Sequence, residues 1–352
     1  MPMPSSLLSV TRCLALSPLW VAQIGTRAKS FRHNPILGSP LLNSWGLHAA
    51  RRQLADAMSK RRRLRLSDEV MLEERVRFDE VGYFVRPNAL GADQFASLCR
   101  EIREACLPAR EMRQGGTVTR RIGLDDTWLK RMPATSRFVK DTSVRSLIHY
   151  AASYAGEPTF AVQTVLASAA EEDLDPQTVL HSDTFHPTAK AWLFLDDVGQ
   201  DDGPFAYVPG SHRLTPQRLV WERTQSLSAA HSQDRMHSEG SLRATEADLS
   251  AMGLPHPERM AVPANTLIVA DTSGFHHRCP SPRPTCRVEV YATLRRTPFL
   301  PWTGGHFAAL PPFAGRFARL EMGMQGLLEG LGLPPNPWRP VGPCGAYEPA
   351  RI

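Results

Sequence analysis

The 352-residue chain has few cysteines and no long apolar run. None of its six cysteines stands in a Cys-x-x-Cys pair, which argues against a zinc ribbon or a thioredoxin-type site. Unpaired cysteines suit a reducing compartment, so we expect a cytoplasmic protein. A membrane-spanning helix needs about 20 apolar residues. The best candidate, residues 13–24, is shorter and is interrupted by Pro18.

Acidic residues are almost missing from the first part of the chain. Residues 1–66 contain eleven Lys or Arg and a single acid, Asp56, whereas the whole chain has a net charge of +6. The rest of the chain is therefore net negative. We interpret residues 1–66 as a basic extension, and three roles remain open: a flexible tail, a segment with weak membrane-surface contact, or an organellar transit peptide. Few aromatic residues accompany the basic ones, so nucleic-acid binding is not expected.

One short motif has the residue types of a metal site. His181 and Asp183 flank Ser182 just before an apolar run, residues 191–195. If the segment is a strand, both side chains project to the same face. A histidine and a carboxylate on one face are two of the three ligands of a 2-His-1-carboxylate iron site. Two other His-x-acid matches, residues 237–239 and 256–258, lie in polar stretches without strand character and are interpreted as surface residues.

The second histidine is expected downstream. Residues 266–270 are typical of a buried strand, a turn-prone cluster follows, and His276 and His277 come next. We expect only one of the two to be a ligand and favour His276. A further strand, residues 286–294, places Arg287, Glu289 and Tyr291 on one face by alternation. An arginine that faces the interior needs an anionic partner, and its planar fork suits a carboxylate.

These motifs, in this order, resemble the phytanoyl-CoA dioxygenase family of non-haem Fe(II), 2-oxoglutarate-dependent oxygenases. The resemblance includes His181 and Asp183, then His276, then Arg287 eleven residues later. Three longer stretches are also similar: residues 77–86, residues 191–213 with their Pro-Gly-Ser-His ending, and residues 271–276. The similar region covers roughly residues 70–297.

The resemblance implies a role for each of these positions. His181, Asp183 and His276 would be the iron ligands, and Arg287 would pair with the distal carboxylate of 2-oxoglutarate. Trp192 matches a position that lines the cosubstrate pocket. We add Gln163, on a strand-like stretch at residues 160–166, as a polar group inside the same barrel, although alternation also allows it to face solvent.

The expected activity follows from that resemblance. Fe(II), 2-oxoglutarate and O2 would hydroxylate a small-molecule or acyl-type substrate, with release of succinate and CO2 and without an obligate protein partner. Related halogenases leave the carboxylate position vacant for chloride, so Asp183 favours hydroxylation. Two alternatives are an inactive binding or scaffold protein of the same fold and a cupin-type metalloenzyme that does not use 2-oxoglutarate.

The fold predicted from these elements is a double-stranded β-helix, a cupin-like jelly-roll barrel with an all-β core and helical additions, α+β overall. We expect the basic extension at residues 1–66 and the dioxygenase domain at residues 67–297. A Pro-rich segment at residues 298–352 should contain one helix, at residues 317–331. A polar insert at residues 214–258 separates the strands that carry the two histidines, where it would cover the substrate.

Overall fold

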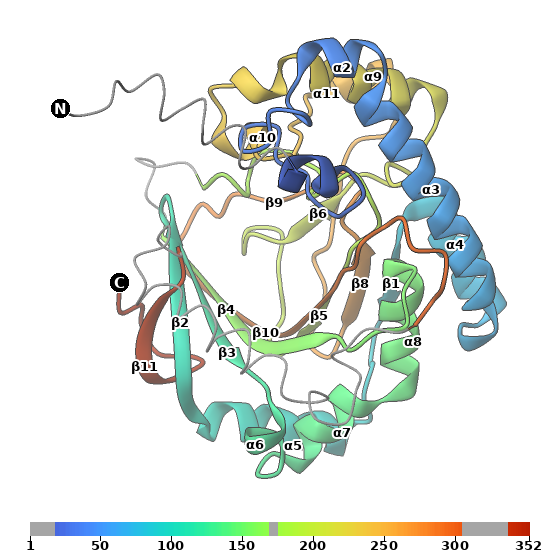
Figure 1. The fold of residues 1–352 in the computed structure, drawn as a ribbon. Coiled ribbons are helices and arrows are strands. Elements are labelled where there is room, and N and C mark those ends of the chain that lie inside the picture. Colours follow the sequence, from blue (N-terminus) through green and yellow to red (C-terminus); the bar gives the residue numbers. More distant parts are fainter. Residues whose placement is uncertain (1–17, 169–174, 305–336) are drawn as a thin grey trace.

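The centre of the molecule is a large antiparallel sheet. The computed structural model describes residues 18–168, 175–304 and 337–352. Within them, eight strands form the larger sheet (Figure 1). In spatial order they are β1 (Tyr83–Arg86), β8 (Leu267–Asp271), β5 (Ala189–Phe194), β10 (Thr285–Leu294), β4 (Thr159–Ala167), β3 (Thr117–Gly123), β2 (Cys106–Gln114) and β11 (Arg339–Gly345).

A smaller sheet faces part of the larger one. It consists of β7 (Glu258–Arg259), β6 (Phe205–Tyr207) and β9 (His276–Arg278), in that spatial order. Apolar side chains from both sheets, among them Trp192, Phe205, Tyr207 and Tyr291, form one buried cluster between them. The predicted double-stranded β-helix with helical additions is confirmed.

Alternation along the central strands separates a helix-covered face from a site face. Val288, Val290 and Ala292 of β10 belong to the main hydrophobic core, which also contains residues of the outer helices. The intervening Tyr291 belongs to the cluster between the sheets. Because successive side chains of a strand point to opposite faces, Arg287 and Glu289 share the inner face with Tyr291, as predicted.

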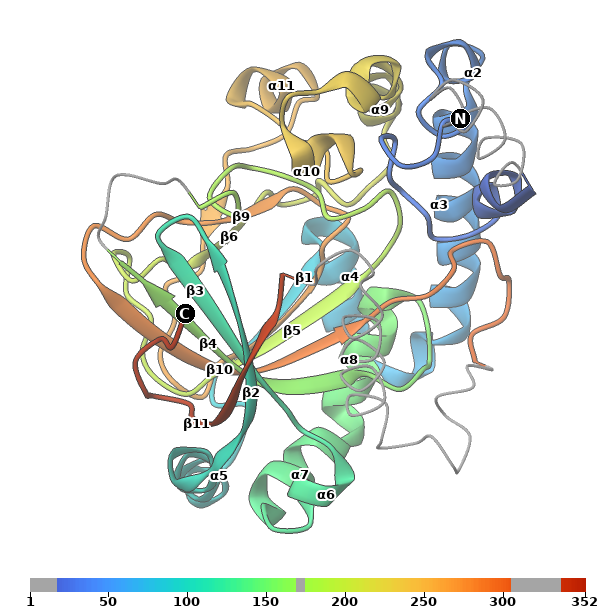
Figure 2. The ribbon, with the colours of Figure 1, turned by 60° about the vertical axis from the view of Figure 1, so that its left-hand side comes forward.

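Four helices cover the outer face of the larger sheet (Figure 2). They are α5 (Ala92–Glu104), α6 (Asp126–Leu129), α7 (Pro133–Lys140) and α8 (Thr142–Ala152). Asp141 caps α8, since its carboxylate accepts hydrogen bonds from the backbone N–H groups of Ser143 and Val144. The buried side chains of α5, α7 and α8 pack into the main core. Their burial fixes the sheet whose opposite face carries the site.

The described part of the basic extension is not a flexible tail. It contains α2 (Pro40–Ser44) and α3 (Leu47–Arg65), and α3 is followed by a 3-10 turn, η1 (Ser67–Glu69), and by α4 (Leu72–Val81). Arg52 is fully buried and donates hydrogen bonds to Glu222 Oε1 and to the carbonyl oxygens of Phe185 and His212. Arg62, also buried, donates to the carbonyl oxygens of Ser153, Pro298 and Leu300.

These arginines explain why the tail interpretation is wrong for residues 18–66. Their acceptors lie far away in the sequence, so a count of charges cannot show that the guanidinium groups are satisfied inside the protein. The buried arginines hold α3 against the domain as core residues would. The exposed basic residues of α3 are Lys60, Arg61 and Arg65.

The polar insert forms a helical layer. It contains α9 (Pro216–Ser228), the 3-10 turn η2 (Ala229–His231), α10 (Arg235–Ser238) and α11 (Glu246–Ala251). Both ribbon views place α9, α10 and α11 beyond the smaller sheet (Figures 1 and 2). Glu222 of α9 joins this layer to α3, because it pairs with Arg52 and Arg218 and contacts His48. Burial alone would raise the pKa of Glu222, but the two arginines hold it far below its usual range.

The end of the chain adds a strand that the sequence did not suggest. β11 pairs with β2 at the edge of the larger sheet, with a shift in register between Pro340 and Gly342. Proline is tolerated at edge strands and bulges because its missing N–H faces away from the ladder. The predicted helix at residues 317–331 lies outside the described residues. In the described ranges, no helix is both long and apolar enough to cross a membrane.

Candidate metal centre

The two candidate histidines lie on segments that hydrogen bond to each other. The N–H of His181 donates to the carbonyl oxygen of His276 at 3.0 Å, and the N–H of His276 donates back at 2.8 Å. Asp183 is held separately, since its N–H donates to the carbonyl oxygen of Thr272 at 2.9 Å. The expectation of a regular strand at His181–Asp183 is wrong, because only an isolated bridge forms there. Pairing with the β9 segment, rather than strand alternation, brings the side chains together.

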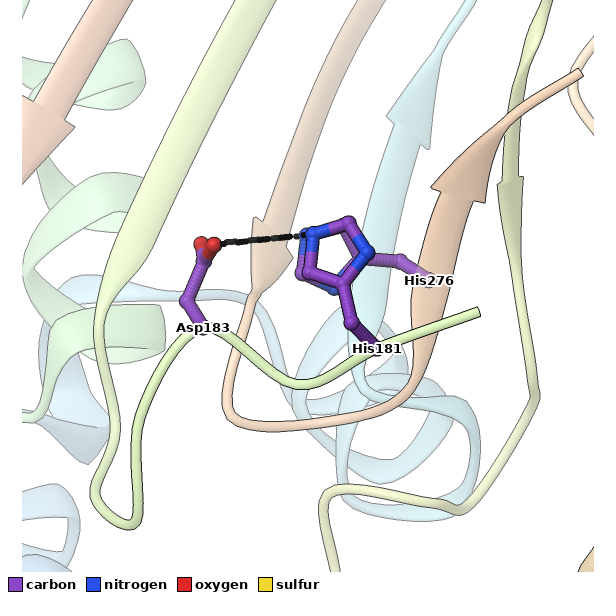
Figure 3. A group of neighbouring side chains, drawn as sticks. All are labelled: His181, Asp183 and His276. Carbon is purple, nitrogen blue, oxygen red and sulfur yellow. Dashed lines mark ion pairs between the residues drawn. The ribbon is translucent and has the colours of Figure 1, made fainter. Parts of the chain in front are cut away.

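Figure 3 shows the three side chains around one point. His181 Nε2 lies 3.8 Å from Asp183 Oδ1, and His276 Nε2 lies 3.7 Å from Asp183 Oδ2. One possible ligand atom from each of the three residues lies within 4.8 Å of the other two. These separations are too long for hydrogen bonds and leave the atoms arranged around a common centre. A cation at that centre would contact all three residues.

The hydrogen bonds on the far sides of the imidazoles select the tautomer that a metal needs. His181 Nδ1 lies 2.7 Å from the carbonyl oxygen of Val179, and His276 Nδ1 lies 3.0 Å from that of Gly274. A carbonyl only accepts, so each Nδ1 carries the proton and each Nε2 keeps its lone pair. His276 Nε2 is buried without a hydrogen-bond partner. The residues therefore fit a divalent metal ion, which would satisfy this orphaned nitrogen.

Gly274 is required for this arrangement. A Cβ at position 274 would lie 2.0 Å from the Tyr207 hydroxyl oxygen, a distance that no side chain can adopt. Tyr207 is itself fixed, because its hydroxyl donates a hydrogen bond to the carbonyl oxygen of Asp271 at 2.8 Å. The glycine lets the backbone pass close to Tyr207 and present its carbonyl oxygen to His276. The Gly-Phe-His pattern in the sequence thus has a steric cause.

The protonation states are those of metal ligands at neutral pH. Burial lowers the pKa of His276 to about 4, and burial together with the charge of His276 lowers the pKa of His181 well below its usual value. For Asp183, burial acts in the opposite direction, but the charge of Lys190 and the two histidines lower its pKa well below the usual range. Two neutral imidazoles and one carboxylate result.

Buried neutral histidines also predict how stability depends on pH. Burial lowers the pKa of His186 and of His212 to about 3. The unfolded chain binds a proton at each with a pKa of about 6.5, so their contribution to stability is present above pH 6.5 and is lost as pH falls toward 3. For each, the free energy of unfolding should fall by about 2 kcal/mol between pH 7.5 and pH 5.

Urea unfolding of the metal-free protein at the two pH values measures this effect. His212→Gln should show a pH dependence smaller by about 2 kcal/mol than the wild type. An equal pH dependence in both proteins would contradict the assignment of His212 as a buried neutral group.

A small cavity of about 170 Å³ adjoins the three residues and contains the other predicted positions. Its lining includes Arg287, Trp192 and Gln163. The side chain of Gln163 therefore faces the inside of the barrel rather than solvent. Arg287 Nε donates to Glu289 Oε2 at 2.9 Å, Arg287 Nη1 donates to the carbonyl oxygen of Gly203, and Gln163 Nε2 donates to Glu289 Oε1 at 2.7 Å. Arg287 Nη2 has no hydrogen bond to the described residues, which leaves it for a ligand in the cavity.

The sequence interpretation missed a lysine beside the metal centre. Lys190 Nζ lies 2.6 Å from Asp183 Oδ2, an ion pair without hydrogen-bond geometry. Lys190 is on β5, two residues before Trp192, so alternation places both side chains on the inner face. That signal was present in the sequence. Lys29, whose ammonium group donates to the carbonyl oxygen of Asp183, had no such signal.

Three further histidines lie near the metal centre without belonging to the ligand group, and His277 lines the small cavity beside it. His277 is only partly buried, and its Nδ1 contacts the carbonyl oxygen of Arg278. His186 is buried and lines a second, larger cavity. His212 packs against Phe78, with ring centroids 5.6 Å apart.

Comparison with known protein families gives one match. The family model for phytanoyl-CoA dioxygenase matches residues 78–250. This match identifies residues 78–250 as a phytanoyl-CoA dioxygenase region. The members of this family are Fe(II)- and 2-oxoglutarate-dependent enzymes, as the motifs predicted. The match includes His181 and Asp183, whereas His276 and Arg287 lie beyond it. The roles of all four residues stay predictions.

Among solved structures, two examples illustrate how distant the similar proteins are. The epimerase SnoN, in complex with Fe3+, alpha-ketoglutarate and nogalamycin RO, has 20% identity and a TM-score of 0.42, covering 63% of this chain and 81% of its own. HygX from Streptomyces hygroscopicus, with nickel, 2-oxoglutarate and hygromycin B bound, has 15% identity and a TM-score of 0.39, covering 64% and 86%. No curated protein matches the chain in sequence.

Proposed function

We propose that this protein is an Fe(II)- and 2-oxoglutarate-dependent dioxygenase that hydroxylates a small-molecule or acyl-type substrate. In the balanced reaction, a C–H bond of the substrate, 2-oxoglutarate and O2 give the hydroxylated product, succinate and CO2. The observation that carries the proposal is the convergence of His181, Asp183 and His276, with a buried, unpartnered imidazole nitrogen, on a cavity that also contains Arg287.

The protein residues have separate tasks in this reaction. His181, Asp183 and His276 would hold the iron, which when bound supplies the redox chemistry that couples decarboxylation to C–H oxidation. Arg287, oriented by Glu289, would hold the distal carboxylate of 2-oxoglutarate through charge-assisted hydrogen bonds. Trp192 forms an apolar wall of the same cavity. The Asp183 carboxylate occupies the place that a halide would need, which supports hydroxylation.

The substrate would enter through the larger cavity. Its volume is about 770 Å³, within the range of small-molecule sites, and it shares Asp183, Lys190 and Tyr291 with the small cavity. A substrate there would lie beside the metal centre while 2-oxoglutarate fills the smaller space. This supports a small-molecule partner. We also propose a cytoplasmic location, with a weak membrane-surface contact through residues 1–66.

Succinate release tests the proposal. The purified protein, supplied with Fe(II), 2-oxoglutarate and O2, should form succinate slowly alone and faster with a true substrate. Omission of Fe(II) should abolish succinate formation. Iron binding without any effect of 2-oxoglutarate would instead favour a cupin-type metalloenzyme, and a folded protein that binds neither would favour an inactive binding protein.

A further inference from the structure

The larger cavity has a wall that the family match does not include. Lys29, Ser30 and Asn34 line it from a segment that precedes residue 78. This segment is fixed in place, because Arg51 donates hydrogen bonds to the carbonyl oxygens of Thr26 and Ala28. The backbone that carries Lys29 is therefore fixed, and it holds the Lys29 side chain next to Asp183.

Basic side chains from several different segments line this cavity. Four of them are Lys29, Arg121 of β3, Lys190 of β5 and Arg295, which directly follows β10. Arg27 and Arg110 also line the cavity and have interactions of their own. The two carboxylates in the lining are already engaged: Asp183 pairs with Lys190 and belongs to the metal centre, and Glu239 pairs with Arg235. The cavity thus has an excess of positive charge.

Within the described residues, Lys29, Arg121 and Arg295 of this lining form no ion pair with a carboxylate, and Lys29 and Arg295 also lack the side-chain contacts that hold Arg121. Lys29 donates its hydrogen bond to a neutral carbonyl oxygen, that of Asp183. Arg295 is exposed and has no ion pair with the described residues. Lys29 lies close enough to Lys190 and Arg295 for their like charges to act on it, whereas Asp183 and Glu239 act on it as opposite charges. An anion bound between Lys29 and Arg295 would relieve the repulsion between the like charges.

We propose that the substrate of this enzyme carries an anionic group, a carboxylate or a phosphate, which Lys29 and Arg295 hold in the larger cavity. This proposal rests on the proposed function, because the bound anion is a substrate only if the protein is an enzyme. Anion binding in this cavity can nevertheless be measured without turnover. The neutral part of the substrate would extend toward Asp183 and the metal centre. Arg121 is less suited to this role, since it donates to Gln163 and stacks on Tyr291.

Saturation-transfer NMR with a matched set of small probes tests the proposal. The probes are benzoate, phenylphosphonate and neutral benzamide, each added to protein with saturating 2-oxoglutarate, both with and without Fe(II) under anaerobic conditions. We expect benzoate or phenylphosphonate to bind at least 10-fold more tightly than benzamide, and the stronger of the two identifies the class of anion. Lys29→Gln and Arg295→Gln should each weaken anion binding at least fivefold.

A neighbouring arginine provides the matched control. Arg32 is exposed, lies three residues from Lys29 and does not line the cavity. Arg32→Gln removes the same charge and should leave anion binding unchanged. Equal binding of benzamide and benzoate, or equal losses in all three variants, would overturn the proposal. Anion binding is also measured without iron. If succinate release is absent and the proposed function fails, the anion-binding result therefore still stands by itself.

Discussion

Replacing His276 with alanine is expected to abolish metal binding. The variant removes a buried nitrogen whose tautomer is fixed by the carbonyl oxygen of Gly274 and which has no other partner. Loss of a residue that merely orients a ligand already costs about 10–100-fold in metal affinity, so loss of the ligand should cost at least about 100-fold. Titration of the anaerobic protein with Fe(II) or Co(II) in a calorimeter measures this affinity, and succinate formation should disappear with it.

The adjacent histidine is the control for this variant. His277 is half-buried and turns its Nδ1 to the carbonyl oxygen of Arg278. His277→Ala should keep both metal affinity and thermal stability close to the wild type. The opposite pattern, metal loss in His277→Ala with retention in His276→Ala, would show that the ligand has been assigned to the wrong residue.

Replacing Arg287 with glutamine is expected to weaken 2-oxoglutarate binding with little effect on iron. Truncation of one partner of a buried, hydrogen-bonded charge pair costs about 2–5 kcal/mol, a factor of roughly 30 to 5000 in affinity. Arg287→Lys should retain part of the affinity, because lysine keeps the charge but loses the fork geometry. Calorimetric titration of 2-oxoglutarate into the anaerobic iron-loaded protein separates the two ligands.

The Glu289 carboxylate requires a second variant. Glu289 is fully buried and pairs with Arg287 at 2.9 Å, so removal of Arg287 alone leaves an unpaired buried charge. The double variant Arg287→Gln, Glu289→Gln removes that charge and should fold with normal iron affinity but without tight 2-oxoglutarate binding. If the folded double variant loses iron and 2-oxoglutarate equally, the role of Arg287 is structural.

The parts of the site that depend on local pattern could be predicted from the sequence. Alternation in β10 places Arg287, Glu289 and Tyr291 together, and the structure puts Arg287 and Tyr291 in the small cavity. Register extends this to residues distant in sequence, since Trp192 lies opposite Tyr291 and Gln163 lies opposite Glu289. Side chains opposite each other in an antiparallel pair share a face, so both reach the same cavity.

Interactions between distant segments could not be predicted in this way. Nothing near Arg62 in the sequence indicates that its guanidinium binds the carbonyl oxygens of Pro298 and Leu300. Lys29 likewise reaches Asp183 only because α3 and its preceding segment pack on the domain. Composition therefore suggested only a basic extension with three open roles, although residues 18–66 are part of the folded protein and form one wall of the larger cavity.

The central claim is that His181, Asp183, His276 and Arg287 together bind iron and 2-oxoglutarate in one site. The most direct measurement is the visible absorption spectrum of the anaerobic protein with Fe(II), before and after addition of 2-oxoglutarate. A weak charge-transfer band should appear only when both are present, should be absent in His276→Ala, and should require far more 2-oxoglutarate in Arg287→Gln. A well-folded wild-type protein that binds Fe(II) but shows no band at saturating 2-oxoglutarate would contradict the claim.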